Sequence, residues 1–309
     1  MAGANFDVAM VCVSLTSPTT EQMLSDLHRA SAQADLAELR LDFMREHDIA
    51  ALLTDRPCPV IVTNRPAREG GRYEGRDGDR VKPLRRAVAL GAEYIDIEHD
   101  SVRLIRDKGE SKIIISYHNF SETPRDLWHI YEWLRDQGAD IVKVATMAND
   151  VTDCLLAFDV LRRAEMPTIA LCMGPAGILT RILAHRFGAY LTFATLGEGV
   201  VSGPGQLTVA EMREVYGADR IGAETRLFGV VGPEANTSPA VGWLNEGLRA
   251  AGADAVCVPV QTTDDAWHAQ ARLPQLGLED CVADGITREQ AAEQAQRWLG
   301  SPGSESMSS

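Results

Sequence analysis

The stretch D-I-V-K-V-A-T, residues 140–146, sets the fold class of this chain. Apolar and mostly β-branched side chains fill it, so we expect a strand buried on both faces, as in a parallel sheet covered by helices. One charged residue, Lys143, interrupts the run. An ammonium group is costly to bury, and burial favours the neutral, nucleophilic form of an amine.

Segments of the same kind lie on both sides of this stretch. With it they make eight candidate strands, at residues 8–15, 35–42, 60–65, 93–98, 112–118, 140–146, 168–173 and 190–196. Helical spacing marks stretches between them, such as 124–137, 151–164 and 178–187. Eight strand–helix units in roughly 220 residues have the size of a (β/α)₈ TIM barrel, an α/β fold. An open doubly wound sheet is the alternative, because periodicity cannot show whether a sheet closes.

Polar residues gather where these candidate strands end. The strand at 35–42 ends in E-L-R-L-D, the strand at 112–118 ends in S-Y-H, and the last strand is followed by S-G-P-G-Q at 202–206. The carboxyl ends of barrel strands meet at one mouth, where the active sites of this fold are built. The sequence therefore predicts a site at that mouth, with Lys143 in it.

Composition excludes several classes of protein. The 309 residues carry 30 Lys and Arg against 44 Asp and Glu, for a formal net charge of −14, so we expect neither a nucleic acid nor an anionic membrane as a partner. No apolar run is long enough to span a bilayer, and the amino-terminal M-A-G-A-N-F-D-V lacks the basic flank of a secretory signal. Six scattered cysteines without C-x-x-C pairs indicate reduced thiols. We expect a cytoplasmic protein.

A second pattern follows the predicted barrel. Two strand-like and two helix-like runs alternate there, at 227–231, 239–251, 255–260 and 288–299. The predicted organisation is a barrel over residues 1–221, a small α/β appendage over 226–300 and a tail over 301–309. The tail is poor in apolar side chains and is expected to be disordered.

Three residues near the predicted mouth suit imine and acid–base chemistry. A buried amine such as Lys143 can attack a ketone or an aldehyde to form an imine. His118 can act as a general acid and base near neutral pH, and Glu69 can orient it by accepting its ring N–H. The alternatives are a structural lysine paired with Glu38 or Asp140, a structural histidine and a solvated carboxylate.

A second group of residues suits an acidic small molecule. Arg181 can clamp a carboxylate through two hydrogen bonds, or it can be an ordinary arginine on a surface helix. Ser202 and Gln206 add neutral donors on a loop whose glycines permit close backbone approach. The G-E-G at 197–199 hints at a dinucleotide fingerprint, but a serine stands at the third glycine position and no ribose-binding acid follows. The sequence contains no recognised metal-binding or phosphate-binding motif.

Six motifs occur in a fixed order along the predicted barrel: E-L-R-L-D (38–42), R-P-A-R-E-G-G (65–71), S-Y-H-N-F (116–120), V-K-V-A (142–145), M-G-P-A-G-I-L-T-R (173–181) and S-G-P-G-Q (202–206). They resemble the motifs of the type I 3-dehydroquinate dehydratase family, hydro-lyases of the shikimate pathway of aromatic amino acid biosynthesis. The resemblance implies a (β/α)₈ barrel, a homodimer, and Schiff-base dehydration of 3-dehydroquinate to 3-dehydroshikimate. It implies neither a metal nor a cofactor.

The resemblance assigns a role to each candidate residue. Lys143 matches the lysine that forms the Schiff base, whose protonated imine acidifies the neighbouring C–H. His118 matches the residue that removes that proton, helps to expel the hydroxyl group as water and hydrolyses the product imine, and Glu69 matches its acid partner. The residues that match binders of the substrate carboxylate are Arg181, Ser202 and Gln206. Those that match residues around the ring hydroxyls are Glu38, Arg40 and Arg65.

The appendage is similar to the start of a shikimate dehydrogenase substrate domain. The similarity rests on L-F-G-V-V-G-P-E-A-N-T-S-P-A-V-G-W-L-N at 227–245 and A-D-A-V-C-V-P-V at 253–260. Of that family's paired substrate serines Ser238 is kept, and the segment 285–289, which matches the region of the catalytic lysine, contains no lysine. The nucleotide-binding half is absent from the sequence. We expect a truncated domain without dehydrogenase activity.

Two other functions compete with the dehydratase. A class I aldolase-like barrel also uses a strand lysine, but it would favour a Gly-rich phosphate site where this chain has an arginine, a serine and a glutamine. A non-catalytic metabolite sensor would not need Lys143, His118 and Glu69 together. The sequence therefore favours a lyase.

Overall fold

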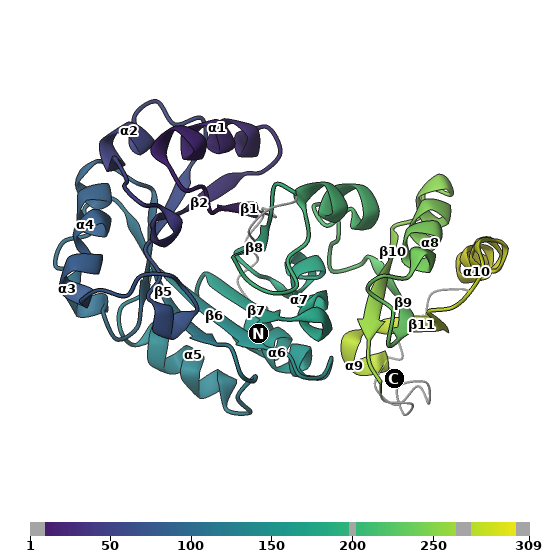
Figure 1. Ribbon diagram of the computed structural model, residues 1–309. Coiled ribbons are helices and arrows are strands. Elements are labelled where there is room, and N and C mark those ends of the chain that lie inside the picture. Colours follow the sequence, from purple (N-terminus) through teal and green to yellow (C-terminus); the bar gives the residue numbers. More distant parts are fainter. Residues whose placement is uncertain (1–9, 198–201, 264–272, 301–309) are drawn as a thin grey trace.

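Eight parallel strands form one sheet that curls into a barrel, as the sequence predicted (Figure 1). The computed structural model describes residues 10–197, 202–263 and 273–300. The strands are β1 (Met10–Leu15), β2 (Leu36–Arg40), β3 (Val60–Thr63), β4 (Tyr94–Glu98), β5 (Lys112–Asn119), β6 (Ile141–Met147), β7 (Thr168–Met173) and β8 (Leu191–Ala194). Their order is β7-β6-β5-β4-β3-β2-β1-β8, and a backbone hydrogen bond of 2.8 Å from Tyr190 N to Thr168 O spans the seam between β7 and β8. The open doubly wound sheet is therefore excluded.

Helices cover the outside of the barrel (Figure 1). They are α1 (Thr20–Ser31), α2 (Ile49–Leu53), α3 (Asp77–Arg80), α4 (Lys82–Ala89), α5 (Leu127–Arg135), α6 (Asp153–Arg163) and α7 (Leu179–Ile182). Gly91 and Gly138 follow α4 and α5 with φ of 77° and 84°, a left-handed conformation that favours glycine at a helix end. No helix in the described residues is long and apolar enough to cross a membrane.

The helix predicted at 178–187 is divided in two. Helix α7 covers only Leu179–Ile182, and a separate 3₁₀ turn follows at His185–Phe187. The carbonyl of Arg181 accepts a hydrogen bond of 3.1 Å from Thr192 Oγ1 on β8. A carbonyl that is satisfied by a neighbouring strand does not need the next helical turn, and hydrophobic spacing cannot reveal such a contact.

Side chains alternate between the outside and the inside of the barrel. On β6, Val142 and Val144 face outward into the main core beneath the helices, whereas Ile141 and Ala145 belong to the apolar cluster inside the barrel. Lys143 stands between the two inward residues, so the same alternation places its side chain in the interior. The inner apolar cluster comprises Cys12, Leu36, Ile61, Ile114, Ile141, Ala145, Ile169, Leu171, Met173, Leu191 and Phe193.

A three-stranded parallel sheet follows the barrel, in the order β10-β9-β11. Its elements are β9 (Arg226–Gly232), α8 (Pro239–Ala250), β10 (Ala255–Gln261), α9 (Leu273–Leu276), β11 (Leu278–Ala283) and α10 (Arg288–Gly300). Strand β11 was not predicted, because its sequence L-E-D-C-V-A lacks a strand pattern. In the structure its pairing with β9 is also irregular, since the register shifts between Leu278 and Asp280. The predicted tail at 301–309 lies outside the described residues.

The small sheet is covered on both faces. Phe228 and Cys257 lie in a cluster with residues of α8 and α10, where the ring of Trp298 stacks on that of Phe228 at 4.2 Å. Val256 and Val258 belong instead to the main core that the barrel helices share, and β10 packs against α7. The barrel therefore completes the apolar packing of the appendage.

Candidate active site

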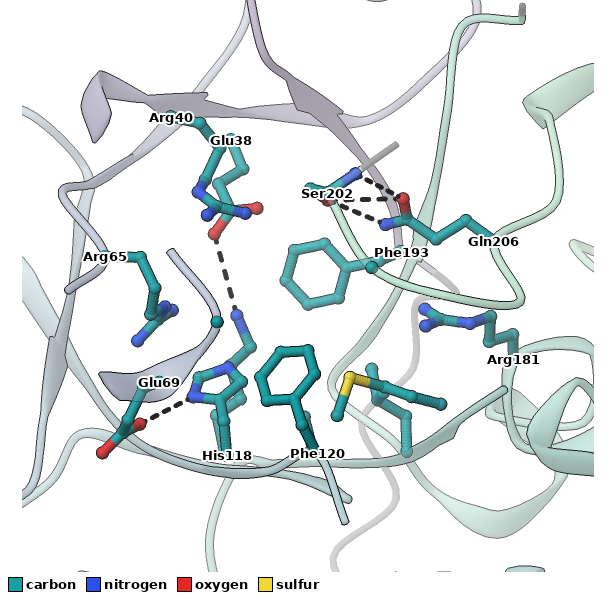
Figure 2. Close-up of a pocket in the computed structure, with 16 residues that line it drawn as sticks. Glu38, Arg40, Arg65, Glu69, His118, Phe120, Arg181, Phe193, Ser202 and Gln206 are labelled. Carbon is teal, nitrogen blue, oxygen red and sulfur yellow. Dashed lines mark hydrogen bonds and ion pairs between the residues drawn. The ribbon is translucent and has the colours of Figure 1, made fainter. Parts of the chain in front are cut away.

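A pocket opens at the carboxyl ends of the barrel strands (Figure 2). It brings together all nine residues proposed from the sequence: Glu38, Arg40, Arg65, Glu69, His118, Lys143, Arg181, Ser202 and Gln206. Apolar residues that the sequence did not single out also line it, among them Phe120, Met173 and Phe193. The pocket holds about 450 Å³ of empty space, part of which is open solvent.

Lys143 lies between two carboxylates in the barrel interior. Its Nζ is 2.8 Å from Asp96 Oδ2 and 3.7 Å from Glu38 Oε1. Asp140, an alternative partner suggested by the sequence, pairs instead with Lys108 at 2.6 Å. Burial disfavours an ammonium group, but two adjacent carboxylates attract it. The same carboxylates fix the position of Nζ at the base of the pocket, so an ion-paired lysine and a poised nucleophile are compatible interpretations.

Asp96 is the residue that sequence reasoning missed. Its buried carboxylate also pairs with Arg65 Nη2 at 2.8 Å and accepts a hydrogen bond of 2.6 Å from Ser116 Oγ. Burial alone would raise the pKa of Asp96, but Arg65 and Lys143 outweigh it and hold that pKa well below its usual range. The available signal was the alternation of Asp96 and Glu98 along β4, which puts two acids on the inward face of one strand.

Two arginines extend this network. Arg65 Nη1 is 2.6 Å from Glu98 Oε1, and Nη1 of the fully buried Arg80 pairs with Glu98 Oε2. Arg80 Nη1 also donates to Asn64 O at 2.8 Å. Burial raises the pKa of Glu98, although Arg65 and Arg80 oppose the change. These buried charges therefore neutralise one another, which is the condition for keeping charged groups in a core.

Glu38 and Arg40, both on β2, are also held by neighbours. Glu38 accepts a hydrogen bond of 2.8 Å from Thr63 Oγ1. Burial would raise the pKa of Glu38, but Lys143 and Arg40 outweigh it, so the pKa is lowered. Arg40 binds Asp42 through two parallel hydrogen bonds, from Nε at 2.9 Å and from Nη2 at 2.8 Å. This bidentate pairing orients the arginine at the rim of the pocket.

His118 and Glu69 form a hydrogen-bonded pair. Nδ1 of His118 is 2.9 Å from Glu69 Oε2, while Glu69 Oε1 is 3.5 Å from His99 Nε2. Burial, with Arg65 and Lys143, lowers the pKa of His118 well below its usual value. Burial raises the pKa of Glu69 to about 8, against the opposing effect of Arg65. His118 is therefore an uncharged imidazole at neutral pH, which is the form that a general base requires.

Arg181, Ser202 and Gln206 occupy the opposite side of the pocket from Glu69 and His118 (Figure 2). Arg181 is 2% exposed, and its Nε is buried without a hydrogen-bond partner among the described residues. Burial lowers the pKa of Arg181 to about 10. Gln206 Nε2 donates to Ser202 Oγ at 3.0 Å. A buried guanidinium group without a carboxylate partner in the described ranges favours an anionic ligand.

Fold and site together define the class of this protein: a (β/α)₈ barrel with a buried lysine–carboxylate centre at its mouth. A family model described as type I 3-dehydroquinase matches residues 11–223, and the chain belongs to that family. Within the described residues, no group of three or more His, Cys, Asp or Glu side chains is placed to hold a metal ion.

Curated relatives carry the same activity in their names. The chain is 36% identical over 218 residues to the 3-dehydroquinate dehydratase of Desulfotalea psychrophila, covering 67% of this chain and 96% of that protein. It is 38% identical over 237 residues to the chloroplastic bifunctional 3-dehydroquinate dehydratase/shikimate dehydrogenase of Arabidopsis thaliana, covering 72% of this chain. The match spans 39% of that longer relative.

Solved structures agree with the fold. The 3-dehydroquinate dehydratase of Geobacillus kaustophilus superposes with a TM-score of 0.61 at 26% identity, over 67% of this chain and 90% of that one. The dehydroquinate dehydratase and shikimate dehydrogenase part of S. pombe AroM superposes with a TM-score of 0.59 over 94% of this chain and 59% of that one. Its identity is 20%, so that second likeness is one of fold.

We predict that Asp96→Ala lowers the free energy of unfolding by about 3–5 kcal/mol, because it leaves Lys143 and Arg65 buried without their shared carboxylate. Chemical denaturation monitored by circular dichroism measures the change. Asp79→Ala, which removes an exposed partner of Lys82, is the matched control and should leave stability nearly unchanged. Equal denaturation midpoints for the two variants would contradict the role of Asp96.

Proposed function

We propose that this chain dehydrates 3-dehydroquinate to 3-dehydroshikimate through a Schiff base on Lys143. The observation that carries the proposal is the polarity of the pocket, with a buried lysine and a neutral histidine at one end and Arg181 at the other. The substrate has the matching groups, since it carries a ketone, ring hydroxyls and one carboxylate. A phosphorylated aldolase substrate would match this arrangement less well.

In the proposed reaction, the ammonium group of Lys143 first gives up a proton and its neutral Nζ attacks the ketone carbon; return of a proton and loss of water then give a protonated imine. Removal of a proton from the neighbouring carbon sends its electron pair towards the imine nitrogen. The pair then returns to expel the ring hydroxyl group, which leaves as water after it receives a proton. Water finally hydrolyses the product imine and releases 3-dehydroshikimate and free Lys143, so the net change is the loss of one water molecule.

Asp96 and Glu38 suit this sequence of steps. A protonated imine carries the same positive charge at nearly the same place as the ammonium group that these carboxylates pair with in the free protein. The carboxylates therefore need no rearrangement when the imine forms, which is the electrostatic preorganisation that lowers reaction barriers. Phe193 adds to this environment, because its ring centroid lies 4.3 Å from Lys143 Nζ.

His118 is assigned the proton transfers. Its neutral imidazole can accept the proton from carbon and return it to the leaving hydroxyl group. When it is ionised, Glu69 orients the ring, because its carboxylate accepts the Nδ1–H and leaves Nε2 free to act as the base. The 2.9 Å distance between His118 Nδ1 and Glu69 Oε2 is that of a hydrogen bond, which holds the ring in one orientation.

The remaining residues are assigned to substrate binding. The substrate carboxylate would be bound by Arg181, Ser202 and Gln206. It would give buried Arg181 the anionic partner that this side chain lacks among the described residues. Arg40 and Arg65 would face the ring hydroxyls. Both are already oriented by carboxylates, so little conformational entropy is lost when the substrate binds.

We predict that borohydride and 3-dehydroquinate together trap a covalent adduct on Lys143, visible as a mass increase and mapped by peptide mass spectrometry. Lys143→Ala should form no adduct and lose roughly 10³-fold or more in kcat. His118→Ala should slow turnover by roughly 10²–10⁴-fold and still form the adduct, because imine formation precedes proton transfer. Wild-type protein that turns over the substrate without any adduct on Lys143 would refute the Schiff base.

The Glu69–His118 pair predicts a pH dependence of kcat/KM. When Glu69 is protonated it donates to Nδ1 of His118, so the proton of the neutral ring sits on Nε2 and the base is blocked. Because the pKa of Glu69 is raised to about 8, kcat/KM should rise with pH to a plateau above that value, with the apparent pKa belonging to the coupled pair. A glutamine at this position cannot ionise, so in Glu69→Gln the rise of kcat/KM with pH should move below pH 6.5. Superimposable profiles would rule out Glu69 as the titrating group.

We also propose that residues 226–300 are a shortened shikimate dehydrogenase-like substrate domain without dehydrogenase activity. Ser238, the retained substrate serine, caps α8 and donates to Asp284 O at 2.5 Å, so its hydroxyl group is already engaged. The chain has no lysine after Lys143. An assay of shikimate-dependent NADP reduction should give no rate above background, and a measurable rate would refute this proposal.

Two finer expectations belong to the same proposal. The chain is proposed to act as a homodimer, as the family resemblance implies, and sedimentation equilibrium that returns a monomer mass would exclude it.

The chain is also proposed to work in the cytoplasm. All six cysteines are free thiols, which is the usual state in a reducing compartment.

A further inference from the structure

The carboxylate-binding end of the pocket is built from short elements. Helix α7, which carries Arg181, has four residues, and the 3₁₀ turn Pro175–Gly177 ends one residue before it. Elements of this length contain few internal hydrogen bonds and depend on outside contacts for their position. The placement of the Arg181 guanidinium therefore depends on what surrounds α7.

One outside contact comes from the appendage. Asn236, in the loop between β9 and α8, donates from Nδ2 to Pro175 O at 2.8 Å. Strand β10 packs against α7 and against the same turn, so the appendage supports this region with both a polar and an apolar contact. In Figure 1 the appendage lies on the α7 side of the barrel.

The supported turn is also hydrogen-bonded to the loop formed by residues 202–206. Gly174, the residue before Pro175, donates its N–H to Pro204 O at 3.2 Å. Gly205 comes so close that a Cβ there would lie 2.5 Å from Gly174 O. Pro204 stands between Ser202 and Gln206, so two hydrogen bonds connect Asn236 to the loop that is proposed to bind the carboxylate.

The segment after α7 is also held by contacts with the connection to the appendage. Arg186 Nη1 donates to Gly222 O at 2.9 Å and to Thr225 O at 2.7 Å, both in the connection that leads from the barrel into β9. Helix α7 is thus held before and after Arg181 by the appendage and its connection. A displaced appendage would shift Arg181 and the 202–206 loop together.

We propose that Asn236 is a positioning residue for substrate binding, through which the appendage braces the carboxylate-binding side of the barrel pocket. The inference rests on the proposed dehydratase function and extends it to a domain outside the barrel. Positioning of this kind acts on the binding of the carboxylate. It does not reach Lys143 on β6 or His118 on β5, which hold their own partners across the pocket.

The experiment compares two substitutions with a control in the full-length chain. Asn236→Ala removes the hydrogen bond, and Asn236→Asp keeps the size of the side chain but places an oxygen against Pro175 O. Arg288→Ala is the control, because it breaks an exposed pair with Glu246 elsewhere in the appendage. Steady-state kinetics with 3-dehydroquinate, thermal melting and borohydride trapping at saturating substrate are measured for each.

Both Asn236 variants should raise KM by roughly three- to tenfold, the effect of losing one well-formed hydrogen bond, with kcat within about twofold of wild type. Arg288→Ala should match wild type in both constants. All variants should form the Lys143 adduct at saturating substrate, because the brace does not contact the nucleophile.

Three results would overturn the inference while the proposed dehydratase function stands. An unchanged KM in both Asn236 variants removes the brace, and a fall in kcat at constant KM shows an effect on chemistry instead of binding. A rise in KM that Arg288→Ala shares reflects general loosening of the appendage. If wild-type protein neither turns over 3-dehydroquinate nor forms the adduct, the proposed dehydratase function fails, and this inference fails with it.

Discussion

The contact between Lys143 and Asp96 is the interaction on which the rest of the structure depends. Asp96 pairs at 2.8 Å with both Lys143 Nζ and Arg65 Nη2, and Arg65 reaches Glu98, which in turn pairs with Arg80. A barrel interior filled with apolar side chains would be at least as stable, since buried ion pairs gain little over hydrophobic packing. The network is retained at the mouth because a buried, fixed amine needs carboxylates around it.

Charge is distributed unevenly across the pocket. Acids and bases balance one another around Lys143, whereas Arg181 at the opposite side has no carboxylate partner within the described ranges. An unbalanced buried cation raises the free energy of the empty site and is relieved by an anion. In the proposed function this unevenness corresponds to a substrate with a ketone at the Lys143 end and a carboxylate at the Arg181 end.

The appendage is part of the same packing unit as the barrel. One face of its sheet is covered by α8 and α10, and the other joins the core beneath the barrel helices through residues such as Val256 and Val258. Without the barrel, that face would be exposed to water. The barrel covers it, which gives a physical reason for the appendage to remain folded and to touch the turn before α7.

Much of this protein followed from local sequence. The apolar run at 140–146, interrupted by Lys143, predicted a buried strand that carries this lysine, and the eight strand–helix units predicted the strand count. Order along the chain also placed His118 at the end of a strand, and Glu69 and Arg181 after strands, whose carboxyl ends meet at one mouth. Such features are local, because the period of a strand and the direction of a parallel sheet are properties of short segments.

Other features were decided by the tertiary structure. Asp96 lies 47 residues from Lys143 in sequence, and the partner of a lysine is chosen by which strands are neighbours, as shown by Asp140, which pairs with Lys108. The early end of the helix predicted at 178–187 and the contact of Asn236 with Pro175 likewise depend on residues that are distant in sequence. Sequence patterns determine which side of a strand or helix a residue faces. Only the packed fold determines what stands opposite, because that depends on segments far apart in the chain being brought within hydrogen-bond distance.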